Sequence, residues 1–432
     1  MTYTIADHIA LRRVSRAAAS PDGSWLAVEV QRLDRDGAKY VSDLWKVPLD
    51  GSAATQLTRG ESRDCAPCFR RDGALAFLSN RSPTAVKPDD GAEDRMQVWL
   101  LPAAGGEAAQ LTDEPLGVQS FAFARNADRL VLVADVLAGV EPAAQREAAR
   151  RRAKEGPSAR HILRQPARHW DHWLHDDADR PCPHLISYQA TTGSSLAIGR
   201  LDLTPQARRE FAVEPQFDIS ADGRLVAATC SSLGPDREED LAILLLHADG
   251  SAQRTLAAAP TVRNESPRFS PDGTRIAVVR SSRSAKEAPR PYLAVVDIGT
   301  GAVQPVAQPW DRWPEEPAWS PDGRRIYVAA DDDGQHPVFA IEIATQSVER
   351  AVAVEAGGSH TGHLVLPDGR LAGLRSTLLS PPECHVLSPS PQARPTVLAR
   401  LSGADETALR ELAQVETLRV PSTDGTDRKS VV

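Results

Sequence analysis

The sequence holds one near match to a nucleophilic serine motif. A serine on a strained strand-to-helix turn needs the pattern Gly-x-Ser-x-Gly, because the glycines leave room around the serine. Gly357-Gly358-Ser359-His360-Thr361 comes nearest, but it has Thr361 at the last position, and we expect it to begin a β-strand. The sequence therefore predicts no catalytic residue.

A second candidate is Cys65-Ala66-Pro67-Cys68, which has the spacing of a redox Cys-x-x-Cys motif. The thiols of such motifs are reactive when they lie at a helix N-terminus. Here the motif falls in the first strand of a repeated unit, and no strand-helix unit follows it. We interpret it as strand. Five cysteines, an odd number, favour a reducing compartment over a disulfide framework.

Three histidines at positions 169, 172 and 175, near Cys182 and His184, have residue types that ligate zinc. Their spacing is helical, but the alternation from His169 to Leu174 is equally typical of a strand, which would put the ligands on opposite faces. An aromatic patch against which an inserted arm packs is the simpler interpretation, and zinc is the alternative. We predict no metal site and no cofactor.

Glu315 and Glu316 are the candidate substrate-binding residues. Two adjacent carboxylates can hold a protonated amine by charge-assisted hydrogen bonds. Glu265 occupies the position of Glu315 in another repeat, so a structural role is the alternative. The acidic run Asp331–Gly334 is interpreted as a solvated turn, because it lacks the ligand order of a calcium loop.

The elements that must position these residues come from a repeat. An Asp-Gly pair between two short apolar runs predicts a β-hairpin, since Gly accepts positive φ and the Asp side chain bonds its own backbone. A third and a fourth strand follow each hairpin. Seven copies recur, with turns at Asp22-Gly23, Asp72-Gly73, Asn126-Ala127, Asp222-Gly223, Asp272-Gly273, Asp322-Gly323 and Asp368-Gly369. Their spacing is about 50 residues except between the third and fourth turns, where it is about twice as long, which predicts an insertion.

Four strands in each period predict an all-β fold, a seven-bladed β-propeller of four-stranded antiparallel blades. Residues 1–14 are expected to form an N-terminal helix, with Thr4 as N-cap and Asp7 as its acidic partner. The propeller would occupy 15–403, with a partly helical insertion at about 137–183 in blade three. Residues 404–432 read as a linker and a fresh strand. The first and last blades each appear complete from one contiguous segment, which predicts closure by packing.

Composition excludes several classes of partner. A net charge of −8 without a basic stripe argues against nucleic acid. No stretch reaches the roughly 18 apolar residues of a membrane helix, which argues against a membrane protein. The first ten residues lack the basic start and apolar core of an export signal, which predicts a cytoplasmic location.

Together these features resemble the S9 (prolyl oligopeptidase) family of serine peptidases, in its acylaminoacyl-peptidase and dipeptidyl-peptidase branch. The resemblance rests on the leading helix, the Ser-Pro-Asp-Gly hairpins, the segment Arg168–Trp173 and the exit from Glu416 to Gly425. It implies a propeller that caps an α/β-hydrolase domain and restricts entry to short peptides. Ser-Pro-Asp-Gly hairpins also occur in TolB-like propellers, which have WD40-like repeats.

The chain departs from that family at its end. An α/β-hydrolase domain needs on the order of 200 residues, and only fourteen follow Leu418. We therefore expect a truncated chain that lacks the hydrolase domain, is inactive alone, and would meet a short peptide substrate only through that missing domain. A homo-oligomer is left open. The alternative is a free-standing TolB-like binding or scaffold propeller.

Overall fold

The computed structural model describes residues 4–81, 95–155, 168–169, 172–173, 181–189, 199–206, 216–233, 239–283 and 288–404. They form two compact bodies. The first body comprises Met1–Pro67 and Ala307–Val432, and the second comprises Cys68–Val306. In the described residues no helix is long and apolar enough to cross a membrane.

The first body contains three four-stranded antiparallel sheets, each built from strands that are consecutive in sequence. Helix α1 (Ile5–Ala10) precedes them, and the 3-10 helix η3 (Val354–Ala356) lies between the last two. The strands are β1 (Arg13–Ala19), β2 (Trp25–Leu33), β3 (Tyr40–Pro48) and β4 (Thr55–Gln56); β23 (Glu315–Trp319), β24 (Arg325–Ala329), β25 (Val338–Glu342) and β26 (Val348–Arg350); β27 (Ser359–Val365), β28 (Leu371–Thr377), β29 (Ser380–Leu387) and β30 (Thr396–Ala399).

The second body contains two four-stranded sheets, one eight-stranded sheet and a two-stranded ribbon, and its boundary falls within β5. The strands of the four-stranded sheets are β5 (Asp64–Phe69), β6 (Leu75–Ser79), β7 (Gln97–Leu101) and β8 (Ala109–Gln110); β9 (Val118–Phe123), β10 (Arg129–Val136), β13 (Cys182–Gln189) and β14 (Leu201–Asp202). The ribbon pairs β11 (Arg168–His169) with β12 (His172–Trp173).

The eight-stranded sheet corrects the expectation of seven separate four-stranded blades. Its strands are β15 (Phe217–Ile219), β16 (Leu225–Leu233), β17 (Glu239–His247), β18 (Gln253–Leu256), β19 (Val262–Phe269), β20 (Arg275–Ser282), β21 (Tyr292–Asp297) and β22 (Val303–Val306). The described residues thus form five separate four-stranded sheets and this larger one. The physical reason is the short β18, which pairs with β17 only from Ile243 to Leu246. Leu241 is left free to pair in parallel with Arg263 of β19, and the Asn264 side chain donates to the Leu241 carbonyl at 2.7 Å.

The Asp-Gly turns form the predicted hairpins by a shared set of hydrogen bonds. At Ser270-Pro271-Asp272-Gly273, the Ser270 hydroxyl donates to Asp272 Oδ1 at 2.6 Å, and the same oxygen accepts the Thr274 amide at 3.0 Å. The Gly273 amide donates to the Ser270 carbonyl at 2.9 Å. The hydroxyl-to-carboxylate bond recurs at Ser20, Ser220 and Ser320. The turn motif therefore organises its own backbone before any sheet packs on it.

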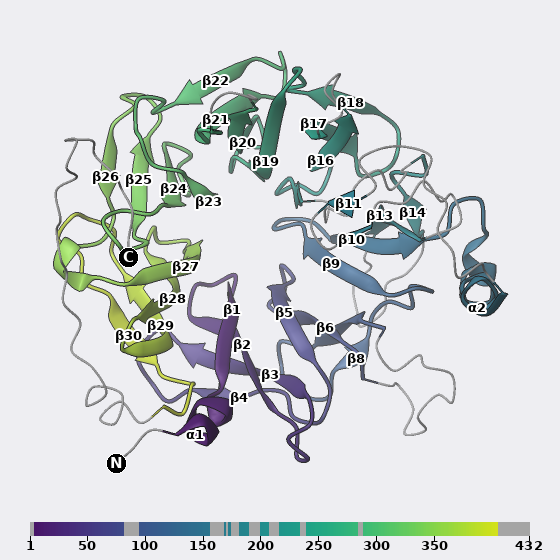
Figure 1. Ribbon diagram of the computed structural model, residues 1–432, viewed down its shortest axis with the longest axis horizontal. Coiled ribbons are helices and arrows are strands. Elements are labelled where there is room, and N and C mark those ends of the chain that lie inside the picture. The colour runs from purple at the N-terminus through teal and green to yellow at the C-terminus, as the bar shows by residue number, and fades with distance from the viewer. Residues whose placement is uncertain are drawn as a thin grey trace. The chain divides into compact units, whose positions relative to one another are not determined.

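The first and last sheets of the chain pack face to face within the first body (Figure 1, purple and yellow). Their common core includes Val28 and Val30 from β2 with Ala372 and Leu374 from β28, all buried. Neither sheet borrows a strand from the other. The predicted joining of these two sheets by packing is confirmed.

Helix α1 lies within the segment where the sequence predicts a leading helix. In α1 the Thr4 hydroxyl accepts the Asp7 amide, and Asp7 accepts the Thr4 amide at 2.8 Å, which makes a capping box. The helix ends at Ala10, earlier than residue 14, because β1 starts at Arg13. Between β10 and β13 lie the 3-10 helix η2 (Pro142–Ala144) and α2 (Gln145–Glu155). The rest of the predicted insertion, and the segment 405–432 with its expected strand, fall mostly or wholly outside the described residues.

Two turn glycines provide a matched test of this packing. Gly223 and Gly273 have nearly equal φ, +71° and +69°. A Cβ at Gly223 would meet Arg129 Cβ at 2.9 Å and Ala127 Cβ at 3.0 Å, whereas a Cβ at Gly273 meets nothing within 4 Å. We predict that Gly273→Ala costs about 1 to 2 kcal/mol from the left-handed backbone alone. Gly223→Ala should cost about 1 to 3 kcal/mol more from overpacking.

Urea denaturation midpoints of the two variants and the parent chain measure this difference. Equal midpoints for the two variants would contradict the close approach at Gly223.

Candidate functional site

Both predicted substrate-binding residues lie in the first body, at the start of β23. The register of β23 against β24 shifts between Glu315 and Ala318, and Glu316 has a φ of +50°, so the strand bulges at this point. The side chains of Glu315 and Glu316 are 64% and 51% exposed. The structure thus brings two solvent-accessible carboxylates together on one strand.

The bulge is a property of the repeat. Ala66, Ser266 and Gly362 also have positive φ, and each, like Glu316, precedes its turn glycine by seven residues. A bulge leaves its extra residue unpaired in the ladder. Three of these residues donate their amides to a side chain of another sheet or segment: Ala66 to Glu29, Ser266 to Gln216 and Gly362 to Glu316.

Glu316 therefore has a structural partner. Its Oε2 accepts the Gly362 amide at 2.9 Å and lies 3.6 Å from His363 Nδ1. The interaction with His363 lowers the pKa of Glu316, and the Gly362 amide lowers it further, although burial opposes both. Glu316 is thus a carboxylate at neutral pH, with one oxygen already engaged.

Glu315 is the less engaged of the two. Its Oε2 lies 3.9 Å from His336 Nε2, and His336 Nδ1 is 2.7 Å from Asp331 Oδ1. A separation of 3.9 Å is too long for a hydrogen bond. Glu315 is consequently the residue whose carboxylate is available to a ligand amine.

Behind this pair lies a group of buried histidines that the sequence analysis did not identify. His360 and His385 are 1% and 3% exposed, and His360 Nδ1 lies 3.3 Å from His385 Nε2. His360 Nε2 and His385 Nδ1 have no hydrogen-bond partner. Burial lowers the pKa of His360 to about 3 and that of His385 to about 4, and Arg375 contributes to both shifts. Both imidazoles are therefore neutral at pH 7.

The other sequence candidates are resolved as follows. Ser359 is the first residue of β27, as expected. Cys65 and Cys68 lie in β5, and burial raises the pKa of Cys65 to about 12 and also raises that of Cys68, so both remain thiols. In the part of the chain that the structure describes, no group of three or more His, Cys, Asp or Glu residues is arranged to hold a metal ion.

The histidines of the zinc alternative are only partly described. The backbone at His169 and His172 is strand, with the two residues paired across the β11–β12 ribbon. The zinc alternative depended on a helix, which would place the histidines on one face, and the backbone at His169 and His172 is not helical. His175 lies outside the described residues.

A serine hydroxyl does approach an imidazole at one exposed turn. Ser251 Oγ lies 3.4 Å from His247 Nδ1, after β17. Among the residues that the structure describes, no carboxylate hydrogen-bonds to His247, so the third member of a catalytic triad is absent there. We interpret this contact as part of the turn.

The acidic run Asp331–Gly334 is held mainly by cations. Asp332 accepts Arg312 Nη2 at 2.8 Å and Arg350 Nη1 at 2.7 Å, and Asp331 bonds His336. These ion pairs support its interpretation as a turn.

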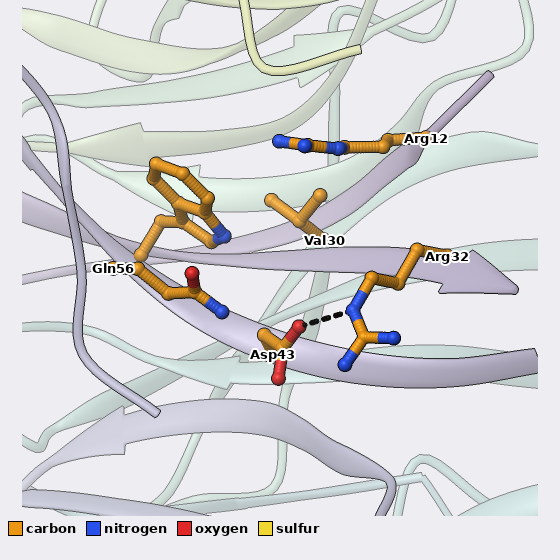
Figure 2. Close-up of a pocket in the computed structure, with 6 residues that line it drawn as sticks. Arg12, Val30, Arg32, Asp43 and Gln56 are labelled. Carbon is orange, nitrogen blue, oxygen red and sulfur yellow. Dashed lines mark hydrogen bonds and ion pairs between the residues drawn. The ribbon is translucent and has the colours of Figure 1, made fainter. Parts of the chain in front are cut away.

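A small cavity in the first body is lined by both polar and apolar side chains (Figure 2). Its volume is about 70 Å³, and its lining consists of Arg12, Val30, Arg32, Asp43, Trp45 and Gln56. Arg32 Nε donates to Asp43 Oδ2 at 2.9 Å, and the Arg12 guanidinium lies 5.8 Å from the Trp45 ring centre. Burial raises the pKa of Asp43, although Arg32 opposes this. Ligand pockets usually exceed about 300 Å³, so this cavity suits a few water molecules.

Comparisons with known proteins agree with this architecture. No family model matches the chain. It is 26% identical over 355 residues to dipeptidyl-peptidase 5 of Porphyromonas gingivalis, an alignment that covers 79% of this chain and 48% of that protein. This chain is homologous to dipeptidyl-peptidase 5. It spans about half the length of that relative.

Solved structures show the fold. Acylaminoacyl peptidase of Pyrococcus horikoshii matches with a TM-score of 0.64 at 14% identity, over 96% of this chain and 56% of that one. The β-propeller domain of the Trilobed protease of Pyrococcus furiosus, described as having an open velcro topology, matches with a TM-score of 0.59 at 11% identity, over 91% of this chain and 99% of that one. The fold is a β-propeller, like the propeller domains of S9 peptidases.

The buried histidines predict a pH-dependent stability. The pKa values of His360 and His385 in the folded chain lie below the ordinary 6.5, so the unfolded chain binds more protons. Stability should therefore fall as pH drops from about 6.5 toward 4, with a slope of up to about 1.4 kcal/mol per pH unit for each histidine. The charged and titratable groups near the pair are Arg375, its ion-pair partner Glu383, His363 and His336.

Urea midpoints between pH 7.5 and 5 measure this slope. His385→Gln should reduce it, and His247→Gln, at an exposed position, should leave it unchanged. An unchanged slope in His385→Gln would show that the pair does not titrate as inferred.

Proposed function

We propose that this chain is the propeller part of an S9-type serine peptidase of the dipeptidyl-peptidase kind, which admits short peptides to an α/β-hydrolase domain. The observation that carries this proposal is the alignment with dipeptidyl-peptidase 5 over 79% of the chain. The propeller fold shared with acylaminoacyl peptidase supports it. The fold alone would be insufficient, because one fold hosts many functions.

We also propose how the sheets correspond to the blades of a propeller. The eight-stranded sheet consists of two antiparallel four-stranded halves, β15–β18 and β19–β22, joined by the parallel pair Leu241 and Arg263. We count each half as one blade. With the five separate sheets this gives seven repeat units, one for each predicted turn.

Glu315 is proposed to contact the amino terminus of the peptide. Its side chain is 64% exposed, and its Oε2 lies 3.9 Å from His336 Nε2, too far for a hydrogen bond. The neighbouring Glu316 adds a second negative charge while its Oε2 holds the Gly362 amide. A protonated amine at this place would gain charge-assisted hydrogen bonds, which a blocked amine could not make.

The chain by itself is proposed not to hydrolyse peptides. Within the described ranges no serine hydroxyl, imidazole and carboxylate form one hydrogen-bonded set.

Helix α1 of the first body carries two exposed apolar side chains. Ile5 and Ile9, one turn apart, are 80% and 46% exposed. Exposed apolar side chains of this kind suit contact with another domain. The cytoplasmic location remains a prediction.

Activity assays with the purified chain test the main proposal. We expect no hydrolysis of dipeptide or acyl-peptide chromogenic substrates, and no serine labelled by a fluorophosphonate probe. A labelled serine would contradict the proposal of an inactive propeller part. A chain that binds no peptide at all would favour the free-standing TolB-like alternative.

The role of Glu315 is tested by calorimetric titration with a dipeptide amide that has a free amino group, and with its N-acetylated form. Glu315→Gln should weaken binding of the free amine about tenfold, the loss of one charge-assisted hydrogen bond. Binding of the acetylated peptide should not change.

Glu265→Gln is the matched control, because Glu265 precedes its turn glycine by the same eight residues as Glu315. Its Oε1 is ion-paired with Arg263 at 3.2 Å. If Glu315→Gln and Glu265→Gln weaken binding of the free amine equally, Glu315 does not contact the amino terminus of the peptide.

A further inference from the structure

A second polar cluster lies in the second body, on one face of β13. Side chains alternate along a strand, so Cys182 and His184 point to the same face. β14 pairs with β13 so that Asp202 stands opposite Ile186, two residues beyond His184. Asp202 is therefore a diagonal neighbour of His184 on that face, within reach of a long side chain.

The three side chains form a continuous hydrogen-bonded row. Cys182 Sγ lies 3.2 Å from His184 Nε2, and His184 Nδ1 lies 2.7 Å from Asp202 Oδ2. One ring nitrogen thus faces the thiol and the other faces the carboxylate. This order of nucleophile, base and orienting acid is the arrangement that activates a cysteine.

The cluster is enclosed, with a partial opening at its acidic end. Cys182 and His184 are 4% and 1% exposed, and the Asp202 side chain is 21% exposed. Burial opposes a charge on His184, but the hydrogen bonds with Asp202 and Cys182 outweigh it and raise the pKa of His184 to about 9. Protonated His184 therefore places an N–H donor beside the sulfur, where it can protonate a leaving group.

The remaining cysteines differ. Burial raises the pKa of Cys65 and of Cys384 to about 12, and it raises that of Cys68 as well. Cys230 is only partly buried, on β16. It supplies an accessible thiol for comparison within the same chain.

We propose that Cys182 is a redox-active thiol, activated by His184 and Asp202, that a small hydroperoxide oxidises to a sulfenic acid. The thiolate sulfur attacks the nearer peroxide oxygen, an S–O bond forms and the O–O bond breaks. The sulfur loses two electrons. The departing hydroxide or alkoxide takes the Nε2 proton of His184 and leaves as water or alcohol. At 4% exposure the thiol is too enclosed to meet a peptide, so the proposed oxidant is a small peroxide.

The test exposes the full-length chain to substoichiometric hydrogen peroxide, traps sulfenic acid with dimedone and maps each cysteine by mass spectrometry. We expect Cys182 to be trapped about tenfold faster than Cys230, because the His184–Asp202 pair faces its sulfur. Asp202→Asn should remove most of that advantage and leave the Cys230 rate at its parent value, which also reports that the variant is folded.

His184→Gln provides the second variant, with circular dichroism as the check on folding. The proposal is overturned if Cys182 reacts no faster than Cys230, or if Asp202→Asn leaves its rate unchanged. It is also overturned if the purified chain contains stoichiometric zinc whose removal is required before Cys182 reacts, because the cluster would then be a metal site.

Discussion

The bulge in the first strand of a repeat unit leaves a backbone amide outside the ladder, and in three units a side chain from elsewhere in the chain accepts a hydrogen bond from it. The acceptor is a side chain earlier in the sequence: Glu29 for Ala66, Gln216 for Ser266 and Glu316 for Gly362. The first body depends on this bond at Gly362, because it sets the position of β23 against β27 and hence the position of Glu315.

This constraint separates two adjacent glutamates that look equivalent in the sequence. Glu316 holds the bulge amide of the next sheet, and Glu315 remains open to solvent. The structural interpretation therefore holds for Glu316, and ligand binding stays a proposal for Glu315. A local pattern could not make this distinction, because Gly362 is distant in sequence from Glu316.

The sequence predicted the hairpins, the leading helix and the strand character of Cys65 and Cys68 because each depends on short-range chemistry: a Ser-Asp turn, a capping box and alternation. It did not predict the joined eight-stranded sheet, which depends on how far β18 extends along β17. Nor did it identify the pair His360 and His385, which lie on β27 and β29, on either side of β28, with one imidazole facing the other. Such contacts depend on register, and turn motifs alone do not fix every register.

Buried histidines have different charge states in the two bodies. His360 lacks a carboxylate partner and is buried beside another imidazole, so it is neutral. His184 is equally buried, but Asp202 faces it, so it is a cation. His360 and His385 therefore carry no positive charge at pH 7, whereas protonated His184 lies 3.2 Å from the Cys182 sulfur.

The most direct measurement is a crystal structure of the chain with a bound dipeptide amide. The account predicts its ammonium nitrogen within about 2.7 to 3.2 Å of a Glu315 carboxylate oxygen, with the bond from the Gly362 amide to Glu316 intact. A peptide bound elsewhere, with Glu315 facing only solvent, would contradict it.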